Sequence, residues 1–309
     1  MARLAAETRL TAHEPDRPAT PEELRAGAAA SDALFCTIAD RVDRALLEAS
    51  PGLRVIANFG VGYNNVDVAA ATARRIPVTN TPGVLTAATA DLAFGLILAA
   101  VRRFGEGEAL VRSGRWTGWA PLQLLGADLA GATLGLVGLE RIGLAVARRA
   151  LAFDMRVVYW NRTRLPADEE ARLHVAYLER DALLAAADVV SLHVAYAAET
   201  HYLIDAAALG RMKRTAVLVN TARGPVVDEA ALVEALRTGR IAAAGLDVYE
   251  HEPSLAPGLV DLPNCVLLPH LGSATHGTRT RMGMMVVDNI LAACAGKRPP
   301  HCVNPEALA

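Results

Sequence analysis

The sequence predicts an α/β protein made of two doubly wound, Rossmann-like parallel-sheet domains with a cleft between them. Three observations lead to this prediction. Strand-like and helix-like segments alternate with short connections along most of the 309 residues. Several of the strand-like segments are continuous, valine-rich apolar runs, as expected of strands that are buried in a parallel sheet. The length suits two domains of ordinary size.

Nine segments have the composition of buried strands. In chain order they are Ala33–Ile38, Leu53–Asn58, Pro77–Asn80, Thr133–Leu139, Arg156–Asn161, Asp188–Val194, Ala216–Thr221, Ala243–Asp247 and Cys265–Pro269. Four segments between or beside them have helical periodicity. These are Leu85–Arg103, Arg141–Phe153, Asp228–Arg240 and Thr275–Ala295.

The first and last of these helices mark the expected domain crossings. Leu85–Arg103 follows the turn-forming residues Thr81-Pro82-Gly83, and Thr275–Ala295 follows the loop Pro269–Ser273. A self-sufficient series of strands and helices lies between them. We therefore expect residues 1–82 and 275–309 to form one domain and residues 83–274 to form a second, inserted domain. A cleft between two such domains is a preferred site for a ligand.

Composition excludes several classes of protein. The chain is 52% apolar and 21% charged, which excludes a disordered chain, and its net charge of −2 gives no sign of nucleic-acid binding. The four cysteines, Cys36, Cys265, Cys294 and Cys302, have no CxxC spacing, which favours reduced thiols over disulfides or a metal site. The N-terminus has no signal-peptide pattern, and the longest apolar run is too short to span a bilayer. We expect a cytoplasmic protein without metal, membrane or nucleic-acid partners.

The turn after Thr133–Leu139 resembles a dinucleotide-binding turn with one substitution. Gly138 and Gly143 occupy the first and third glycine positions of G-x-G-x-x-G, and Arg141 and Ile142 open the helix. Glu140 replaces the second glycine, which normally lets the backbone approach the pyrophosphate. A carboxylate about 5 Å from a phosphate costs on the order of 1–3 kcal/mol at intermediate dielectric. We expect weakened cofactor binding unless this side chain turns outward or pairs with an arginine.

The end of the next strand favours NADP over NAD. Asn161 stands about 20 residues past the first glycine, where an acidic residue normally binds the ribose 2′-hydroxyl. Arg162, Thr163 and Arg164 follow, and an arginine at this place can accommodate a 2′-phosphate. The alternative is that the two arginines are solvated surface residues.

Five segments carry motifs that point to a known family. They are Val55–Asp67, Thr79–Arg103, Val217–Asp228, Ala244–Pro253 and Leu268–Thr275. Together they closely resemble the D-isomer-specific 2-hydroxyacid dehydrogenases, specifically the glyoxylate/hydroxypyruvate reductase branch. The resemblance runs from about Ala5 to the end and implies that residues 1–82 and 275–309 are a flavodoxin-like substrate-binding domain. Residues 83–274 are then the dinucleotide-binding Rossmann domain.

The resemblance also implies roles for particular residues. Arg223 matches the substrate-binding arginine, Glu252 the acid that pairs with the catalytic histidine, and His270 the general acid/base. The loop Gly60-Val61-Gly62 matches the carboxylate-binding loop, and Trp119 matches a tryptophan that enters the neighbouring subunit's active site. Asp247 matches the residue that contacts the nicotinamide carboxamide, and Thr89 falls on a cofactor-contacting position. The cofactor-binding set that we predict is Thr89, Gly138, Arg141, Ile142, Gly143, Asn161, Arg162, Thr163, Thr221 and Asp247.

Elementary chemistry supports these roles. Reducing a 2-keto acid needs a cation for the carboxylate and carbonyl, a proton donor and a hydride donor. A guanidinium offers two parallel donors, and an imidazole beside a carboxylate is an acid near neutral pH. Backbone amides at Val61 and Gly62 suit a carboxylate. Glu250 is a rival to Glu252, whereas His193 and His201 are expected to be structural.

Besides Glu140, the start of the chain departs from the family pattern. Residues up to Ala6 enter partway along the expected first helix, and Arg9–His13 would be the second strand. The first strand of the smaller sheet is then absent, which a start site placed too late would explain. A milder departure is Ala195-Tyr196, where a proline and a leucine are usual.

The sequence thus predicts an NADPH-preferring reductase of small 2-keto acids, glyoxylate and hydroxypyruvate first, that forms a homodimer. NAD(H) remains a possible cofactor. Within enzymes the alternative is an NAD-dependent D-2-hydroxyacid or D-3-phosphoglycerate dehydrogenase. From another class, the alternatives are a nucleotide-sensing binding protein, as in the C-terminal binding protein corepressors, or a degenerate non-enzyme with a defective turn at Glu140.

Overall fold

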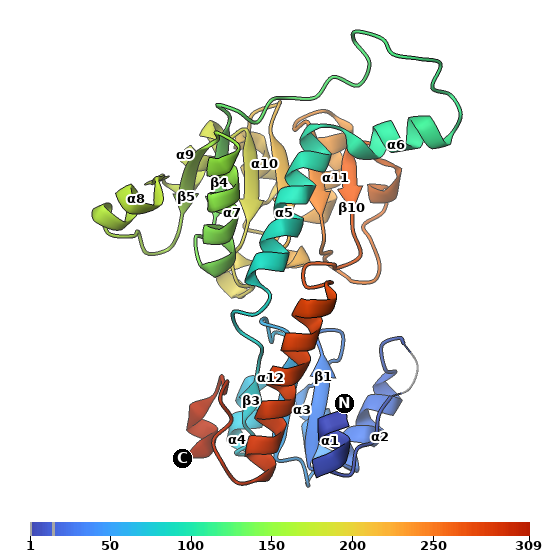
Figure 1. Ribbon diagram of the computed structural model, residues 1–309, viewed down its shortest axis with the longest axis vertical. Helices are drawn as coiled ribbons and strands as arrows, with labels where there is room; N and C mark the ends of the chain where they lie inside the picture. Colours follow the sequence, from blue (N-terminus) through green and yellow to red (C-terminus); the bar gives the residue numbers. More distant parts are fainter. Residues whose placement is uncertain (1, 14–15) are drawn as a thin grey trace. The chain divides into compact units, whose positions relative to one another are not determined.

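The computed structural model describes residues 2–13 and 16–309. The chain divides into two compact units, each drawn in Figure 1. Unit 1 comprises Met1–Leu85 and Ala274–Ala309, and unit 2 comprises Thr86–Ser273. In the part of the chain described, no helix is both long and apolar enough to cross a bilayer.

Unit 1 is a small parallel sheet with helices around it. Its strands are β1 (Ala33–Thr37), β2 (Val55–Phe59) and β3 (Val78–Thr79), in the order β1-β2-β3. Its helices are α1 (Ala2–Glu7), α2 (Pro21–Ala29), α3 (Arg44–Glu48), α4 (Val68–Ala73) and α12 (His276–Cys294), with a 3₁₀ turn at Pro305–Leu308. Leu4 of α1 is buried with Ala57 of β2 and with Val286 and Ile290 of α12. The N-terminal and C-terminal segments therefore share one core within this unit.

Residues 9–13 do not form the strand that the sequence predicts. The segment is exposed irregular chain, and β1 pairs with β2 alone among the described residues. A strand persists when its backbone groups find partners, and this segment has no neighbouring strand to pair with. The prediction of a strand at Arg9–His13 is therefore wrong.

Unit 2 contains one parallel sheet of seven strands. They are β4 (Thr133–Val137), β5 (Arg156–Trp160), β6 (Val175–Tyr177), β7 (Val189–Leu192), β8 (Val217–Asn220), β9 (Ala243–Leu246) and β10 (Cys265–Leu267). Their order is β10-β9-β8-β7-β4-β5-β6. The chain order reverses between β4 and β7, and ligands of open α/β sheets bind outside the carboxyl ends of the strands at such a point. The short strand β6 is one that the sequence analysis did not predict.

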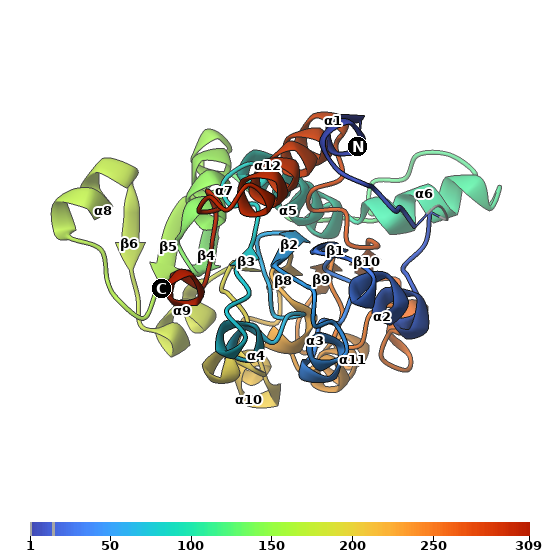
Figure 2. The same ribbon diagram turned by 90° about the horizontal axis from the view of Figure 1, so that it is seen from below.

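Helices cover both faces of this sheet, as Figures 1 and 2 show. The helices of unit 2 are α5 (Thr86–Val101), α6 (Phe104–Arg112), α7 (Arg141–Ala152), α8 (Ala167–Leu173), α9 (Arg180–Ala186), α10 (Ala206–Arg211) and α11 (Glu229–Arg237), with 3₁₀ turns at Ala198–Thr200, Gly224–Val226 and Leu259–Asp261. The core on one face joins α5 and α7 to the sheet, and the core on the other joins α9, α10 and α11 to it. The central strands β4, β7, β8 and β9 are thus buried on both faces, which accounts for their continuous apolar runs in the sequence.

Local chemistry determines where several helices begin. Asp67, Asp205 and Asp228 accept a backbone hydrogen bond at the N-termini of α4, α10 and α11, and Thr275 does so for α12. Such side chains satisfy N–H groups that have no partner inside a helix. These caps place the loops that precede them, and several of those loops carry candidate site residues.

Candidate active site

Arg223, Glu252 and His270 follow three neighbouring strands of unit 2. Arg223 comes after β8, Glu252 after β9 and His270 after β10, and these strands are adjacent in the order β10-β9-β8. Because the carboxyl ends of parallel strands meet at one edge of a sheet, residues far apart in sequence lie near one another. The sheet topology therefore gathers the three residues at one edge.

His270 and Glu252 form a direct pair. His270 Nδ1 lies 2.9 Å from Glu252 Oε2, and the backbone N–H of Tyr249 donates to the other carboxylate oxygen at 3.0 Å. Burial alone would raise the pKa of Glu252. The hydrogen bond and positive charge of His270 outweigh it and, with Tyr249 N–H and the charge of Arg223, hold this pKa below its ordinary value. Glu252 is accordingly an anion that accepts the Nδ1 proton of His270.

Asp247 holds the turn that carries His270. His270 is in the left-handed region, with φ of 55°, a conformation that is uncommon for a residue with a side chain. Its N–H donates to the Asp247 carbonyl, and the N–H groups of Leu271 and Gly272 donate to the Asp247 carboxylate at 2.6 and 2.8 Å. Thr89 donates its hydroxyl to the Gly272 carbonyl at 3.0 Å. Asp247 and Thr89, predicted as cofactor contacts, thus lie beneath this turn.

The loop of Arg223 packs tightly against the segment before Glu252. A Cβ at Gly224 would lie 1.8 Å from the backbone carbon of Tyr249, so only glycine allows this approach. Asn220 braces the loop from inside, because its side chain accepts from Ala222 N–H and donates to the Arg223 carbonyl. Burial lowers the pKa of Arg223, while the charge of Glu252 raises it. The Arg223 guanidinium is therefore largely shielded from solvent and feels the negative charge of Glu252.

The glycine-rich turn leads from β4 into α7. Gly138 has φ of 99°, and a Cβ there would lie 2.8 Å from the His193 carbonyl carbon. A Cβ at Gly143 would lie 2.2 Å from the Gly138 oxygen. Glu140, between them, is an exposed N-cap with φ of −99° and makes no side-chain capping bond. The first and third glycines are therefore sterically required, whereas the backbone at Glu140 accepts any residue.

The carboxyl-terminal edge of the larger sheet has buried polar groups without hydrogen-bond partners in the part of the chain that the structure describes, and a bound dinucleotide could satisfy them. Asn161 accepts the Leu139 N–H at 2.7 Å, so its side chain supports the turn from the end of β5. Thr221 Oγ1, just after β8, and His193 Nδ1, just after β7, are buried without hydrogen-bond partners in the described residues. Buried polar atoms are normally paired, and unpaired ones gather where a protein meets a ligand or water. The residues present are thus compatible with a bound cofactor.

The two arginines after β5 differ in what they contact. Arg164 forms a bidentate ion pair with Glu170 through two bonds of 2.8 Å, and Glu170 also accepts the Tyr159 hydroxyl. The hydrogen bonds from Arg164 and Tyr159 lower the pKa of Glu170 to about 2. Arg162 is exposed and forms no ion pair within residues 2–13 and 16–309. Of the two arginines that the sequence offers for a 2′-phosphate, Arg164 is engaged with Glu170, and Arg162 is the one without an ion pair among the described residues.

The expected carboxylate-binding loop lies in unit 1, directly after β2. The Val61 carbonyl accepts from the Asn80 side chain at 2.8 Å, and the Gly62 carbonyl accepts from the Asn58 side chain at 2.9 Å. The N–H groups of Val61 and Gly62 have no acceptor in the described part of the chain. The two asparagines thus orient the loop while its donors stay available.

Trp119 lies on a segment of unit 2 that makes few contacts within the unit. Helix α6 and the chain after it extend outward in Figure 1. Trp119 is 83% exposed and Leu122 is 80% exposed, and the large apolar residues Phe104, Val111, Trp116 and Leu125 are also exposed here. Exposed apolar patches of this kind are typical of protein interfaces. We call residues 104–125 the arm.

Comparison with known proteins decides the family. Residues 94–272 match the model for the D-isomer specific 2-hydroxyacid dehydrogenase, NAD binding domain. The chain belongs to the D-isomer specific 2-hydroxyacid dehydrogenase family. The two-sheet α/β fold and the NAD(P)-binding domain that the sequence predicts are confirmed by this match and by solved structures of the family.

Relatives of this dehydrogenase are known in sequence and in structure. A glyoxylate reductase from Thermococcus litoralis is 50% identical over 90% of this chain and 85% of that protein, and one from Korarchaeum cryptofilum is 51% identical over 90% and 84%. An NADPH-dependent glyoxylate/hydroxypyruvate reductase from Sinorhizobium meliloti, solved with NADP and malonate, is 40% identical over 91% of this chain and 86% of that one, with a TM-score of 0.82. A Thermus thermophilus protein aligns with a TM-score of 0.90 at 48% identity, covering 98% and 95%.

Sequence reasoning missed the role of Tyr249 in this dehydrogenase and expected His193 to be structural without identifying its partner. Tyr249 donates its hydroxyl to the Leu268 carbonyl at 2.9 Å, two residues before His270. His193 shares a 2.9 Å hydrogen bond with Ser191, and burial lowers its pKa to about 4, so the ring is neutral near pH 7. The available signal for such residues is a polar side chain at or soon after the end of a strand. Local sequence does not identify the partner of such a side chain when that partner follows another strand.

Glu140 gives a direct test of the turn in this dehydrogenase. We expect Glu140→Gly to tighten NADPH binding by roughly 1–3 kcal/mol, or about 5- to 150-fold, because one charge opposing the pyrophosphate is removed. Stability without cofactor should change little, since the side chain makes no capping bond. Cofactor fluorescence titrations of wild type and variant measure the affinity. Glu140→Gln, which keeps the length and removes the charge, should recover most of the gain. Equal affinities in all three proteins would show that the carboxylate points away from the phosphates.

Proposed function

We propose that this protein is an NADPH-preferring reductase of small 2-keto acids, with glyoxylate and hydroxypyruvate as first substrates. The observation that carries the proposal is the His270–Glu252 pair on the strand edge that also presents Arg223. Relatives at about half identity that are named glyoxylate reductases support the choice of substrate.

His270 is the proposed proton donor. Its Nδ1 proton is held by the Glu252 carboxylate, so the other ring nitrogen, Nε2, is left to protonate the keto oxygen. The anionic Glu252 stabilises the imidazolium from which that proton is given. A nicotinamide cofactor, when bound, would supply the hydride that adds to the keto carbon. Asp247 holds the left-handed backbone of His270, and this limits the positions that the imidazole can take.

Arg223 is the proposed ligand for the substrate's carboxylate and carbonyl oxygens. A guanidinium offers parallel N–H donors that match a planar acid, and its partly buried setting strengthens the interaction. The free N–H groups of Val61 and Gly62 are proposed as additional carboxylate donors. No side-chain charge is needed in that loop.

The proposed preference for NADPH rests on Arg162. We expect Arg162→Ala to raise the KM for NADPH on the order of 10- to 100-fold and to leave that for NADH nearly unchanged, because a charge-assisted contact to a phosphate contributes about 1.5–3 kcal/mol. Steady-state kinetics with each cofactor measures both values. Arg148→Ala, which removes an exposed arginine on α7, is the matched control. An equal loss with both cofactors would show that Arg162 does not read the 2′-phosphate.

The proposed assembly is a homodimer made through the arm, with Trp119 entering the partner's active site. The exposed apolar side chains of the arm have no cover within unit 2, and a twofold partner would supply it. Light scattering at micromolar concentration should give twice the chain mass of 32.6 kDa. Replacing Trp119 and Leu122 together by serine should shift the protein toward monomer. A monomeric wild type contradicts the proposal.

One assay tests the function as a whole. The purified protein is mixed with NADPH or NADH and with glyoxylate or hydroxypyruvate, and oxidation of the cofactor is followed by absorbance. We expect turnover with both acids and a lower KM for NADPH than for NADH. Absence of turnover with every combination, in protein whose circular dichroism shows a folded chain, would overturn the proposal.

A further inference from the structure

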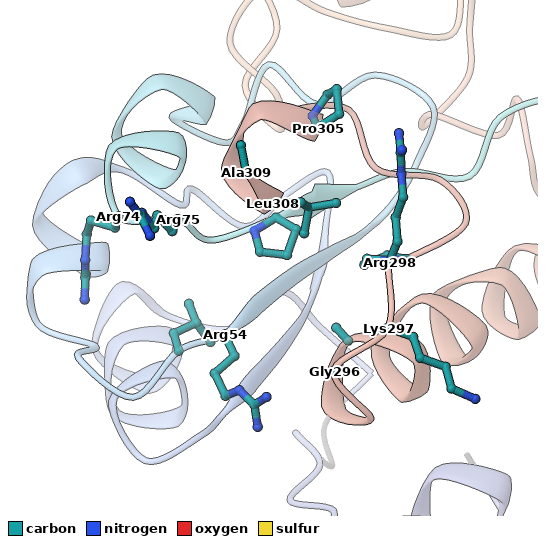
Figure 3. A pocket seen from close by; sticks show the side chains of 13 residues that line it. Arg54, Arg74, Arg75, Gly296, Lys297, Arg298, Pro305, Leu308 and Ala309 are labelled. Atoms are coloured by element: carbon teal, nitrogen blue, oxygen red, sulfur yellow. The ribbon is translucent and has the colours of Figure 1, made fainter.

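A hollow with an excess of positive charge lies in unit 1, and none of the candidate catalytic or cofactor residues lines it. Its volume is about 650 Å³, within the range of small-molecule sites. The basic residues that line it are Arg54, Arg74, Arg75, Lys297 and Arg298. Figure 3 shows them spread around the hollow, with Leu308 and Ala309 between them. No Asp or Glu side chain is among the lining residues.

The hollow is at the edge of the sheet opposite to the candidate carboxylate-binding loop. Arg54 directly precedes β2, and Arg74 and Arg75 lie between α4 and β3, so they stand where the strands begin. Gly60-Val61-Gly62, in contrast, follows the end of β2. Lys297 and Arg298 come from the segment after α12. Three stretches of chain, far apart in sequence, thus bring basic residues to the rim of one hollow, with the side chains of Arg54, Lys297 and Arg298 pointing in different directions in Figure 3.

None of these five basic side chains forms an ion pair within the described part of the chain. Elsewhere in unit 1 arginines do pair, as Arg3 does with Asp288 and Arg17 with Glu23. Arg74 donates Nη2 to the Ser50 carbonyl at 3.2 Å, while its Nη1 is buried without a partner in residues 2–13 and 16–309. An unsatisfied buried donor is unusual in a folded protein.

The charges at the hollow have little to balance them. Glu306 lies on the same 3₁₀ turn as Leu308 and does not line the hollow. A bound multivalent anion would supply the negative charge that no ion pair of the described residues provides to these side chains. Guanidinium groups suit phosphate in particular, because they donate to it in pairs.

The floor of the hollow is apolar. Leu53 and Ala293 are buried, and Pro77, Pro299 and Leu308 complete the surface between the charges. A purely electrostatic patch needs no such floor, whereas an organic group attached to the anion would pack against it. The arrangement combines a cationic rim with an apolar base.

We propose that this hollow in unit 1 is a binding site for a polyphosphate-bearing ligand with at least three negative charges. The triphosphate chain lies along the basic rim, and any organic group of the ligand rests on the apolar floor. The site is separate from the proposed reductase chemistry, so the two proposals stand or fall independently.

The test is calorimetric titration of the whole protein with inorganic tripolyphosphate and, separately, with ATP. We expect saturable binding of both that weakens as salt is added, because the contacts are ionic. Arg54→Ser/Arg298→Ser should weaken binding on the order of tenfold or more, since two charge-assisted contacts are lost. Tighter binding of ATP than of tripolyphosphate would show that the floor holds the nucleoside, and equal binding would show that the phosphates alone are recognised.

Two control variants keep the inference falsifiable. Arg9→Ser/Arg44→Ser removes the same charge from exposed positions of unit 1 that do not line the hollow, and it should bind as wild type does. Arg162→Ala, at the proposed cofactor site, should also bind as wild type does. The inference is overturned if neither ligand binds, if both unit 1 double variants lose affinity equally, or if the loss follows Arg162 instead.

Discussion

His270→Gln is expected to lower kcat by roughly 10²-fold or more, with cofactor affinity nearly unchanged. A glutamine amide can occupy the space of the imidazole and accept or donate a hydrogen bond near Glu252, which now lies 2.9 Å from His270 Nδ1. It has no proton to transfer at neutral pH, so the keto oxygen loses its acid. The measurement is steady-state reduction of glyoxylate, combined with fluorescence titration of the cofactor.

His251→Gln is the matched control for this variant. The His251 side chain is 80% exposed and lies 3.7 Å from Glu250, which itself accepts the Tyr202 hydroxyl. This variant makes the same substitution, histidine to glutamine, at a nearby position outside the His270–Glu252 pair. We expect its kcat to match wild type. A fully active His270→Gln, or an equal loss in both variants, would refute the assignment of His270 as the proton donor.

Arg223→Lys is expected to be nearly as damaging, with kcat/KM for glyoxylate reduced about 10²-fold. Lysine keeps the charge but offers a point ammonium in place of a planar fork, so one of two charge-assisted bonds to the acid is lost, at about 1.5–3 kcal/mol. The lysine ammonium also reaches less far than the guanidinium of Arg223, so the keto oxygen of the substrate is less polarised. Cofactor affinity should stay near the wild-type value.

Arg214→Lys provides the comparison, because Arg214 is exposed on the same unit just before β8. It should retain full activity. The tight contact of Gly224 with Tyr249 makes the neighbourhood of Arg223 sensitive to backbone shifts, so thermal unfolding of both variants is measured as well. Wild-type kcat/KM in Arg223→Lys would show that a bidentate contact is not used.

Much of the fold is predictable from the sequence because the central strands of the larger sheet are buried on both faces. The nine predicted strands from Ala33 onward each overlap an observed strand, with ends that differ by at most two residues, as for Val55–Phe59 against the predicted Leu53–Asn58, whereas the strand predicted at Arg9–His13 is not formed. The strand β6 has three residues and lies at the edge of the sheet, so it carries no long apolar run. Short helices such as α8 and α9 were not predicted, since one or two turns show little periodicity.

The candidate site is predictable to the level of motifs and no further. Spacing and resemblance pointed to Arg223, Glu252 and His270, and left Glu250 as a rival acid. In the folded chain Glu250 accepts from Tyr202 and Glu252 faces His270, because the backbone of Tyr249 turns the second carboxylate inward. Arg162 and Arg164 look alike in sequence. They differ because Glu170 of α8 reaches back to only one of them.

The sequence by itself determined the fold class, the chain order of the long strands and helices, the glycine-rich turn with its substituted residue and the choice of Arg223, Glu252 and His270 as candidate reactive side chains. These features follow from local composition, from periodicity and from short sequence motifs. Only the tertiary structure decided that Asp247 and Thr89 hold the His270 turn, that Arg164 is engaged, and that five basic residues from three segments surround one hollow. Each of these contacts joins residues brought together by sheet pairing and helix packing, and a linear sequence does not specify which distant side chains will meet.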